Sequence, residues 1–369
     1  MKIVSIETFT TKQISIVRIR TDDGREGYGQ TAPYIHANIA ALVLHQQISP
    51  YVLGADVSRI EDIGPLAEKC IEGEHKFPGS YIARAVGGID TALWDLHGKI
   101  QNKSVCELLG GKKTAVEVYG SSMSRTITPE EEAERLKRLK ESHGFKAFKI
   151  RVGNNFGHDV DAWPGRTEAI VPAVRQAIGK DTLLYVDANS AFSPERAIEV
   201  GHMLEQNGVC HYEEPCPYPE LEWTQQVNQA LSLSVTGGEQ DTDLAQFKRM
   251  IAMRAVDIVQ PDVCYIGGLS RALKVAKLAE EAGMTCTPHS SNLSMVTVFT
   301  LHMLGAIPNA GRFMEYTIEW NNSWTDGLFS PPLEVIDGWV EIPKGPGWGV
   351  TISKDWLDKA MYQITRLEL

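Results

Sequence analysis

A chain of 369 residues with 43% apolar and 22% charged residues is long enough for two domains, or for one large α/β barrel with an accessory unit. Its net charge of −11 argues against broad binding of nucleic acid or of anionic membranes, because both select clustered Lys and Arg. An anionic substrate would therefore need a local cationic pocket.

The six cysteines are scattered, with no CxxC pair and no zinc-type spacing, so the sequence predicts neither a disulfide framework nor a zinc site. The N-terminal stretch MKIVSIETFTTK lacks the apolar core of a signal peptide, and no run of about eighteen apolar residues follows. We therefore predict a cytoplasmic protein with no membrane and no nucleic-acid partner.

The sequence pattern of residues 1–112 predicts a small α+β domain. Alternating apolar and polar residues over 3–12 and 14–30 are typical of antiparallel strands. Helical patterns then cover 37–48, 57–71 and 81–100. Strands and helices segregated in this way indicate an α+β unit.

The pattern of residues 113–318 differs from that of 1–112: short apolar runs alternate with amphipathic helices. Eight such runs start at residues 115, 147, 183, 210, 233, 257, 285 and 312, mostly 23 to 28 residues apart. One strand, one loop and one helix need about this length, so the spacing predicts a closed parallel α/β barrel. Residues 319–369 lose the rhythm and carry Gly and Pro turns, and we expect extended chain that returns to the first domain.

Charged residues and one histidine occur where the predicted barrel strands end, at intervals of 26, 26, 23, 27 and 26. They are Asp187, Glu213, Glu239, Asp262, His289 and Glu315. Catalytic groups of such barrels lie at the carboxyl ends of the strands. A single carboxylate there is as readily a helix N-cap or a solvated loop residue, but the whole series predicts one shared site.

Asp187, Glu213 and Glu239 end three consecutive strands, so their charges would converge on one mouth. Carboxylates that close raise one another's pKa unless a cation neutralises them. Mg²⁺ takes oxygen ligands in an octahedral shell and leaves positions for substrate and water. We predict these three residues as ligands of Mg²⁺.

The stretch AFKIRVG over 147–153 reads as a strand with two cations on one face. Period-two alternation places Phe148 and Ile150 on the side opposite Lys149 and Arg151. Two cations beside a metal suit an anionic small-molecule substrate, most simply a carboxylate. The alternative is that both merely pair with barrel acids such as Asp187.

Asp262 and His289 end neighbouring strands and can form a dyad in which the carboxylate fixes the imidazole tautomer and raises its basicity. A buried structural histidine is the alternative. Glu315 follows on the last strand, where a protonated carboxyl could donate a hydrogen bond to a substrate oxygen. The alternative, that Glu315 is only a salt-bridge partner at the barrel mouth, explains its position nearly as well.

These residues resemble the enolase superfamily, and within it the mandelate racemase subgroup. The resemblance spans essentially the whole chain and rests on GGIDTALWDLHGKIQNKSVCELLGG, KIR, DAN, EEP, GGE, PD, PH, EY and PKGPGWGV. It implies a modified (β/α)7β barrel, a variant TIM barrel, with an N-terminal capping domain and mobile loops, and a homo-oligomer. It also implies that Mg²⁺ binds a substrate carboxylate, a base removes the α-proton, and the metal stabilises the enediolate.

By the same resemblance, Lys149 would neutralise the substrate carboxylate, and Asn189 would orient substrate or ligands. Cap loops near 29–37 and 74–81 would close over the substrate. That makes Tyr34, His75 and Tyr81 candidate substrate-binding residues, although exposed loop aromatics often have no function.

The sequence departs from the racemases at Arg151, where they have a second lysine as base. An arginine stays protonated at ordinary pH, so His289 is left as the one clear base. β-Elimination needs only one, because its imidazolium can protonate the departing hydroxyl. This predicts an acid-sugar dehydratase that converts an aldonate or aldarate to a 2-keto-3-deoxy acid. The alternatives are a racemase or epimerase, a cycloisomerase, and a catalytically inactive barrel that serves as a scaffold.

Overall fold

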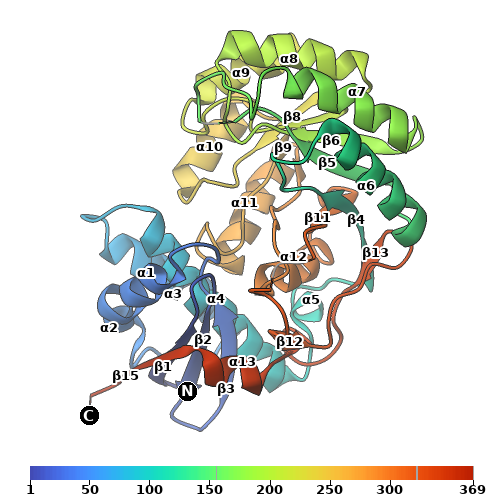
Figure 1. The fold of residues 1–369 in the computed structure, drawn as a ribbon. Coiled ribbons are helices and arrows are strands. Elements are labelled where there is room, and N and C mark those ends of the chain that lie inside the picture. Colours follow the sequence, from blue (N-terminus) through green and yellow to red (C-terminus); the bar gives the residue numbers. More distant parts are fainter. Residues whose placement is uncertain (155, 321–322, 369) are drawn as a thin grey trace.

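The computed structural model describes residues 1–154, 156–320 and 323–368, which form a cap and a barrel side by side (Figure 1). The cap holds a four-stranded antiparallel sheet of order β15-β1-β2-β3. Its strands are β1 (Ile3–Thr10), β2 (Ser15–Thr21), β3 (Glu26–Gln30) and β15 (Met361–Arg366). No helix in the described part of the chain has the length and apolar character needed to cross a membrane.

The helices of the cap cover one face of this sheet. They are α1 (Ala37–Val43), a π-helical continuation η1 (Leu44–Ile48), α2 (Ser49–Val52), the short η2 (Ile60–Asp62), α3 (Ile63–Gly73), α4 (Ser80–Gln101) and α5 (Val105–Leu108). The predicted helix over 37–48 is thus real, with a change of hydrogen-bonding pattern inside it.

The cap sheet and its longest helix approach each other closely at glycines. A Cβ on Gly29 would lie 2.5 Å from the carbonyl oxygen of Gly88 in α4, so a side chain at this position has no room. Helix α4 also reaches the barrel, where the Trp94 indole donates to the Ser270 hydroxyl over 3.0 Å. α4 therefore fixes the cap against the barrel.

The barrel sheet runs in the order β10-β9-β8-β7-β6-β5-β4-β11, and all neighbours on this path are parallel. Its strands are β4 (Ala115–Ser121), β5 (Ala147–Arg151), β6 (Leu183–Asp187), β7 (His211–Glu213), β8 (Ser234–Gly237), β9 (Ile258–Val259), β10 (Thr285–Cys286) and β11 (Phe313–Thr317). All eight start within one residue of the predicted positions. An isolated parallel bridge between Cys286 and Ala310 joins the two ends of the path.

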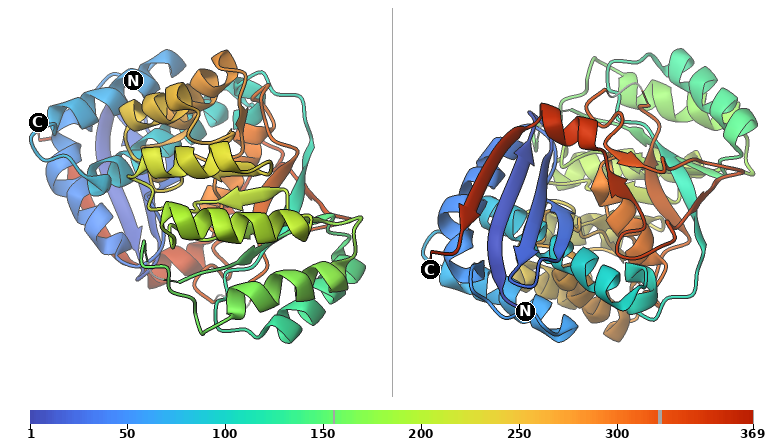
Figure 2. Two further views of the ribbon diagram at one scale, coloured as in Figure 1. Left: turned by 90° about the horizontal axis from the view of Figure 1, so that it is seen from above. Right: turned by 90° about the horizontal axis from the view of Figure 1, so that it is seen from below.

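Helices cover the outside of the barrel sheet, as both views of Figure 2 show. They are α6 (Pro129–His143), α7 (Arg166–Ile178), α8 (Pro194–Gln206), α9 (Leu221–Ala230), α10 (Leu244–Met253), α11 (Leu269–Glu281) and α12 (Met295–Leu304). Consecutive parallel strands need a crossover connection, and in such barrels that connection is a right-handed one through a helix. The predicted α/β fold, a modified barrel with an α+β cap, is confirmed.

The C-terminal segment runs past the barrel before it reaches the cap. It contains β12 (Phe329–Ser330), β13 (Trp339–Glu341), β14 (Thr351–Ile352) and α13 (Lys354–Lys359). β13 pairs antiparallel with β4 of the barrel, a pairing that the sequence did not indicate. β15 pairs antiparallel with β1, with Tyr362 opposite Phe9 (Figure 2). We propose 1–112, 113–318 and 319–369 as the structural units of the chain.

Candidate active site

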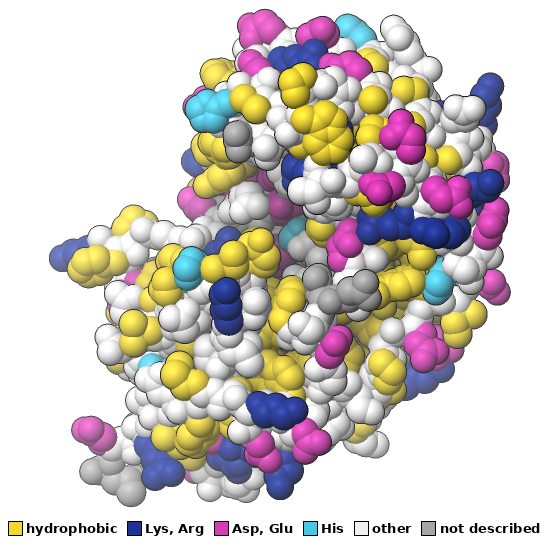
Figure 3. Space-filling model, viewed as in Figure 1, with side chains coloured by type: hydrophobic (Ala, Val, Ile, Leu, Met, Phe, Trp, Pro, Cys, Tyr) yellow, Lys and Arg dark blue, Asp and Glu magenta, His cyan; other side chains and the backbone are white. Residues whose placement is uncertain are grey.

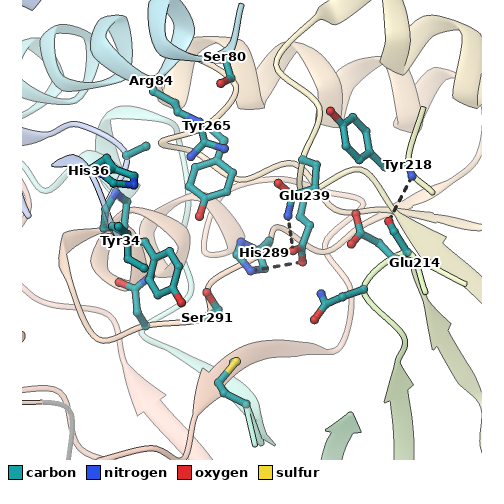
Figure 4. Close-up of a pocket in the computed structure, with 18 of the residues that line it drawn as sticks. Tyr34, His36, Ser80, Arg84, Glu214, Tyr218, Glu239, Tyr265, His289 and Ser291 are labelled. Carbon is teal, nitrogen blue, oxygen red and sulfur yellow. Dashed lines mark hydrogen bonds and ion pairs between the residues drawn. The ribbon is translucent and has the colours of Figure 1, made fainter. Parts of the chain in front are cut away.

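A cavity of about 750 Å³ lies between the cap and the carboxyl ends of the barrel strands. In Figure 3 this face of the molecule is hollowed between the two parts, and acidic side chains lie inside the hollow. Tyr34, His36 and Arg84 line it from the cap, and Glu214, Glu239 and His289 line it from the barrel (Figure 4).

The three predicted metal ligands meet beside this cavity, and of the three only Glu239 is among its described lining residues. Asp187 ends β6, Glu213 ends β7, and Glu239 follows β8 by two residues. All three are buried, and each offers an oxygen within 4.8 Å of those of the other two. Their convergence follows from the parallel register, which sets Asp187 opposite Glu213. Such a set of three carboxylate oxygens fits a hard divalent cation.

The charges of the three carboxylates are unequally compensated. Burial, with repulsion from Glu213 and Asp187, raises the pKa of Glu239 to about 7. Burial also raises the pKa of Asp187. Burial acts in the same direction on Glu213, but the Lys149 ammonium outweighs it and holds the pKa of that carboxyl well below its usual range. Glu239 Oε2 is buried and forms no hydrogen bond among the described residues, and its ion-pair partner there is His289 Nε2 at 3.3 Å.

Lys149 and Arg151 contact these acids from β5. The Lys149 ammonium lies 2.6 Å from Glu213 Oε1, 2.8 Å from Glu315 Oε1 and 3.2 Å from Asp187 Oδ2. Burial opposes its charge, but these acids raise the pKa of Lys149 well above its usual value. Arg151 pairs with Asp187 and lines the cavity. The sequence offered two interpretations of Lys149 and Arg151: cations that face an anionic substrate, or cations that pair with barrel acids. The structure shows the ion pairs with the acids, and it also places Arg151 in the lining of the cavity.

His289 and Asp262 form the predicted dyad. His289 Nδ1 lies 2.8 Å from Asp262 Oδ2, and Asp262 Oδ1 accepts hydrogen bonds from the backbone N–H groups of Cys264 and Tyr265. His289 Nε2 is 3.3 Å from Glu239 Oε2. Burial disfavours the imidazolium, but Glu239, Glu315 and Asp262 together raise the pKa of His289 to about 10. The histidine lines the cavity, so the dyad faces the space that a substrate would fill.

Glu315 is surrounded by donors at the end of β11. Its Oε1 accepts from Ser121 and Lys149, and its Oε2 accepts from the backbone of Ser290 over 2.9 Å. Burial raises its pKa, but Lys149 and His289 outweigh burial and bring the pKa of Glu315 to about 2. An ionised carboxylate accepts hydrogen bonds and cannot donate one. The geometry thus favours the salt-bridge alternative over the protonated donor.

The candidate substrate-binding residues divide into two groups. Asn189 lines the cavity, and its Oδ1 accepts from Arg151 and from Arg125 over 2.8 Å each. Tyr34 and Tyr81 also line it and remain 60% and 39% exposed. His75 is not among the described residues that line the cavity; it lies exposed, with Nδ1 2.9 Å from the carbonyl oxygen of Glu72.

Sequence reasoning missed several polar residues of the cavity. Among them are His36, Arg84, Arg125, Tyr218 and Tyr265. Arg125 donates to the carbonyl oxygen of Gly153 and to Asn189, and burial lowers its pKa to about 10. It lies four residues beyond β4, and its place after a strand end is the signal that could have found it.

Glu214, next to the ligand candidate Glu213, also faces the cavity (Figure 4). Its backbone is left-handed, with φ of 41°, and its Oε1 is buried without a hydrogen-bond partner in the described part of the chain. Burial, with repulsion from Glu239, raises the pKa of Glu214 well above its usual value.

A capped parallel barrel with acids, a lysine and a histidine at its strand ends defines an enzyme of the enolase superfamily. The chain belongs to the mandelate racemase/muconate lactonizing enzyme family. The N-terminal domain of that family matches residues 2–110, and the enolase C-terminal domain-like family matches residues 131–356. The predicted family is therefore confirmed.

Named relatives work on acid sugars. The chain is 30% identical to arabinonate dehydratase of Saccharolobus solfataricus, over 92% of this chain and 88% of that protein. It is also 30% identical to D-galactarolactone cycloisomerase of Agrobacterium fabrum, over 93% of this chain and 89% of that protein.

Two solved structures resemble the fold closely. A Roseobacter denitrificans protein, described as a candidate racemase, is 52% identical over 100% of both chains, with a TM-score of 0.96. A mandelate racemase/muconate lactonizing protein from Paracoccus denitrificans, complexed with magnesium, is 28% identical over 99% of this chain and 98% of that chain, with a TM-score of 0.89.

Proposed function

We propose that this enzyme is a Mg²⁺-dependent acid-sugar dehydratase, a lyase that removes water from an aldonate or aldarate to give a 2-keto-3-deoxy acid. The observation that carries the proposal is the asymmetry of the site. The His289–Asp262 dyad offers one base, while Arg151, ion-paired with Asp187, is a fixed cation. A site with one base suits elimination better than racemisation, which needs an acid or base on each face of the α-carbon.

The site fits the metal that the proposal needs. Asp187, Glu213 and Glu239 would hold Mg²⁺, since each offers a carboxylate oxygen, the ligand type that this cation prefers, and these oxygens lie within 4.8 Å of one another. The bound ion would supply positive charge beside the substrate carboxylate, where negative charge grows as the α-proton leaves.

The side chains of the chain carry the proton steps. Against the effect of burial, the neighbouring acids, Glu239 foremost, raise the pKa of His289 to about 10, so the neutral imidazole that serves as base requires a cation at Glu239 to offset part of that attraction. In that state His289 Nε2, held in orientation by Asp262 at Nδ1, takes the proton from the α-carbon, and the electron pair moves onto the carboxylate. The positive charges of Arg151 and Lys149 stabilise that second negative charge. The imidazolium then gives its proton to the 3-hydroxyl, the C–O bond breaks, and water leaves. The enol that remains becomes the 2-keto acid.

A direct test is proton NMR in D₂O with Mg²⁺ over a library of aldonates, aldarates and anhydro-sugar acids. We expect loss of the α-proton signal together with new 2-keto-3-deoxy signals for one or a few acids. Loss of the α-proton without elimination would contradict the dehydratase proposal. Mg²⁺ binding with no α-proton exchange on any acid would revive the scaffold alternative.

Racemisation and cycloisomerisation are the second candidate. The relative named D-galactarolactone cycloisomerase and the Roseobacter protein described as a candidate racemase favour it. Both reactions begin or end at the same enediolate, so the same residues would serve. In the NMR experiment an epimer or a cyclised product, formed with solvent deuterium at the α-carbon, would identify this activity.

A further inference from the structure

The Arg84 guanidinium gives the cap side of the cavity a positive charge that lies apart from the predicted metal ligands. None of the described lining residues that come from the cap is an Asp or Glu. On the barrel side the lining includes two acids, Glu214 and Glu239, and two arginines, Arg125 and Arg151. Figure 4 shows the separation, with Arg84, His36 and Tyr34 on one side and Glu214 and Tyr218 on the other.

Arg84 is held at the cavity by an aromatic ring and not by an acid. Its guanidinium carbon stacks 3.7 Å from the centre of the Tyr265 ring. No described carboxylate forms an ion pair with it, whereas Arg151 pairs with Asp187. An arginine on an aromatic face keeps its planar fork of donors free for a bidentate partner.

The loop beside Arg84 is strained. Tyr34 and His36 have φ of 86° and 76°, in the left-handed region that non-glycine residues avoid. Both side chains line the cavity. Strain of this kind persists where the surrounding structure imposes it and is concentrated at ligand sites. The loop thus directs a tyrosine and a histidine toward the same side as Arg84.

The distances match the length of a sugar acid. The centre of the Tyr265 ring lies 5.9 Å from that of the His289 ring, so the Arg84 guanidinium carbon is within about 10 Å of the imidazole. In an extended six-carbon acid, the α-carbon and the far terminal carbon are about 5 Å apart. A charge-assisted hydrogen bond adds about 2.8 Å. A substrate deprotonated by His289 can therefore reach Arg84 with its far end.

We propose that Arg84, with the His36 and Tyr34 side chains, forms a second anion subsite that selects a dicarboxylate, an aldarate, over the aldonate of the same configuration. This rests on the proposed acid-sugar activity and narrows its substrate class. The far carboxylate binds the guanidinium in a bidentate pair, which the neutral hydroxymethyl end of an aldonate cannot form.

The test compares each aldarate with its matching aldonate, at four to six carbons, in the Mg²⁺-loaded enzyme. We expect the aldarate of the best pair to have a kcat/KM higher by about 10-fold or more. Arg84→Gln is expected to lower kcat/KM for the aldarate by about 10- to 100-fold, mainly through KM, and to change the aldonate value less than about 2-fold. Arg84→Lys should fall between, because it keeps the charge and loses the fork.

The control is Lys69→Gln, which removes an exposed cation from α3 of the cap, outside the described lining of the cavity. It should leave both substrates unaffected. A binding measurement by calorimetry in the His289→Asn background checks the subsite without turnover: Arg84→Gln should weaken the affinity for the aldarate about as much as it raises KM.

Three results would overturn the inference while leaving the dehydratase proposal intact. They are equal loss of aldarate and aldonate turnover in Arg84→Gln, an aldonate as the better substrate of wild type, and a phosphorylated aldonate preferred over every aldarate. Absence of α-proton exchange on all acids would instead contradict the dehydratase proposal.

Discussion

The His289 imidazole is fixed from behind, since Asp262 contacts Nδ1 and is itself held by two backbone N–H groups. His289→Asn removes the base, and we expect turnover to fall by at least about 10³-fold. Mg²⁺ affinity should change little, because the three predicted ligand residues remain. Turnover by NMR and Mg²⁺ binding by calorimetry measure the two effects separately. Substantial residual turnover would remove His289 from the role of base.

Glu213, one of the three ligand candidates, contacts Lys149 at 2.6 Å and Gln260 at 2.8 Å. Glu213→Gln removes one of the three negative charges, so we expect Mg²⁺ affinity to fall by at least about 10-fold. Addition of Mg²⁺ should then raise the melting temperature of wild type more than that of the variant, since an ion that binds only the folded state stabilises it. Unchanged Mg²⁺ affinity would exclude Glu213 as a ligand.

Metal binding should depend on pH through Glu239, whose pKa burial raises to about 7. Below that pH the carboxyl is protonated in the metal-free protein and must lose its proton before it can bind a cation. Affinity for Mg²⁺ is therefore expected to fall about 10-fold per pH unit below 7, with release of about one proton per ion. Calorimetry in buffers of different ionisation enthalpy counts the protons. A flat affinity between pH 5.5 and pH 8 would contradict this assignment.

How far residues could be predicted depended on regularity. Regular spacing was enough to predict which polar residues lie at or just after the barrel strand ends, because those ends recur at a nearly constant interval. These residues are Asp187, Glu213, Glu239, Asp262 and His289. Their roles in binding and catalysis stay predictions. Arg84 escaped notice because it lies inside a cap helix, and its approach to the barrel depends on how two domains pack. Hydrophobic periodicity carries no information about how two domains pack. The residues on the cap side of the site could therefore be identified only from the structure.

Among the elements, β3 and α4 make the tightest contact that the structure describes in the cap. Gly29→Ala would place a Cβ 2.4 Å from Thr91 Oγ1 and 2.5 Å from the Gly88 carbonyl oxygen, so the strand must move away. We expect the free energy of unfolding to fall by about 3 kcal/mol, as measured by urea denaturation. The cavity should also be disturbed, since the loop that carries Tyr34 follows β3 directly.

The control for this change is Gly64→Ala in α3, where the new Cβ would make only ordinary contact, 3.7 Å from the Ser270 Cβ. Alanine favours helix over glycine, so stability should stay the same or rise slightly. If both substitutions had the same effect, the close approach at Gly29 would not be what joins β3 to α4.

Element prediction succeeded where one local pattern decided the structure. The eight barrel strands are short, apolar and flanked by helices, and all were located. β13 was not, because its partner β4 lies more than two hundred residues earlier and only the folded chain brings them together. Nor does hydrophobic periodicity distinguish the π-helical segment η1 from the α-helix it continues.

On the scale of the whole molecule, three arginines line one cavity of a chain whose net charge is −11: Arg84, Arg125 and Arg151. Acids line the same cavity, so a cation bound at the predicted metal ligands would be needed to make the hollow favourable to an anionic substrate. Homo-oligomer formation and a cytoplasmic location stay predictions.

The cap sheet should depend on the C-terminal strand. A chain truncated after residue 360 loses β15, so β1 loses six paired residues and Glu7 loses its hydrogen bond from Tyr362. We expect a lower melting temperature and faster proteolysis within residues 1–112, while the barrel resists longer. Limited proteolysis with mass spectrometry locates the cuts, and full-length protein is the reference. Equal protection of both chains would show that β15 does not support the cap.

The pairing of β15 with β1 also sets an order of events during synthesis. β1, β2 and β3 leave the ribosome before the barrel, yet one edge of their sheet stays open until the strand at 361–366 has been translated. The entire barrel emerges in between and can begin to fold beneath a cap that is still incomplete. A nascent chain interrupted near its end would therefore expose an unpaired β1 edge, a template for aggregation that chaperones or proteases could recognise.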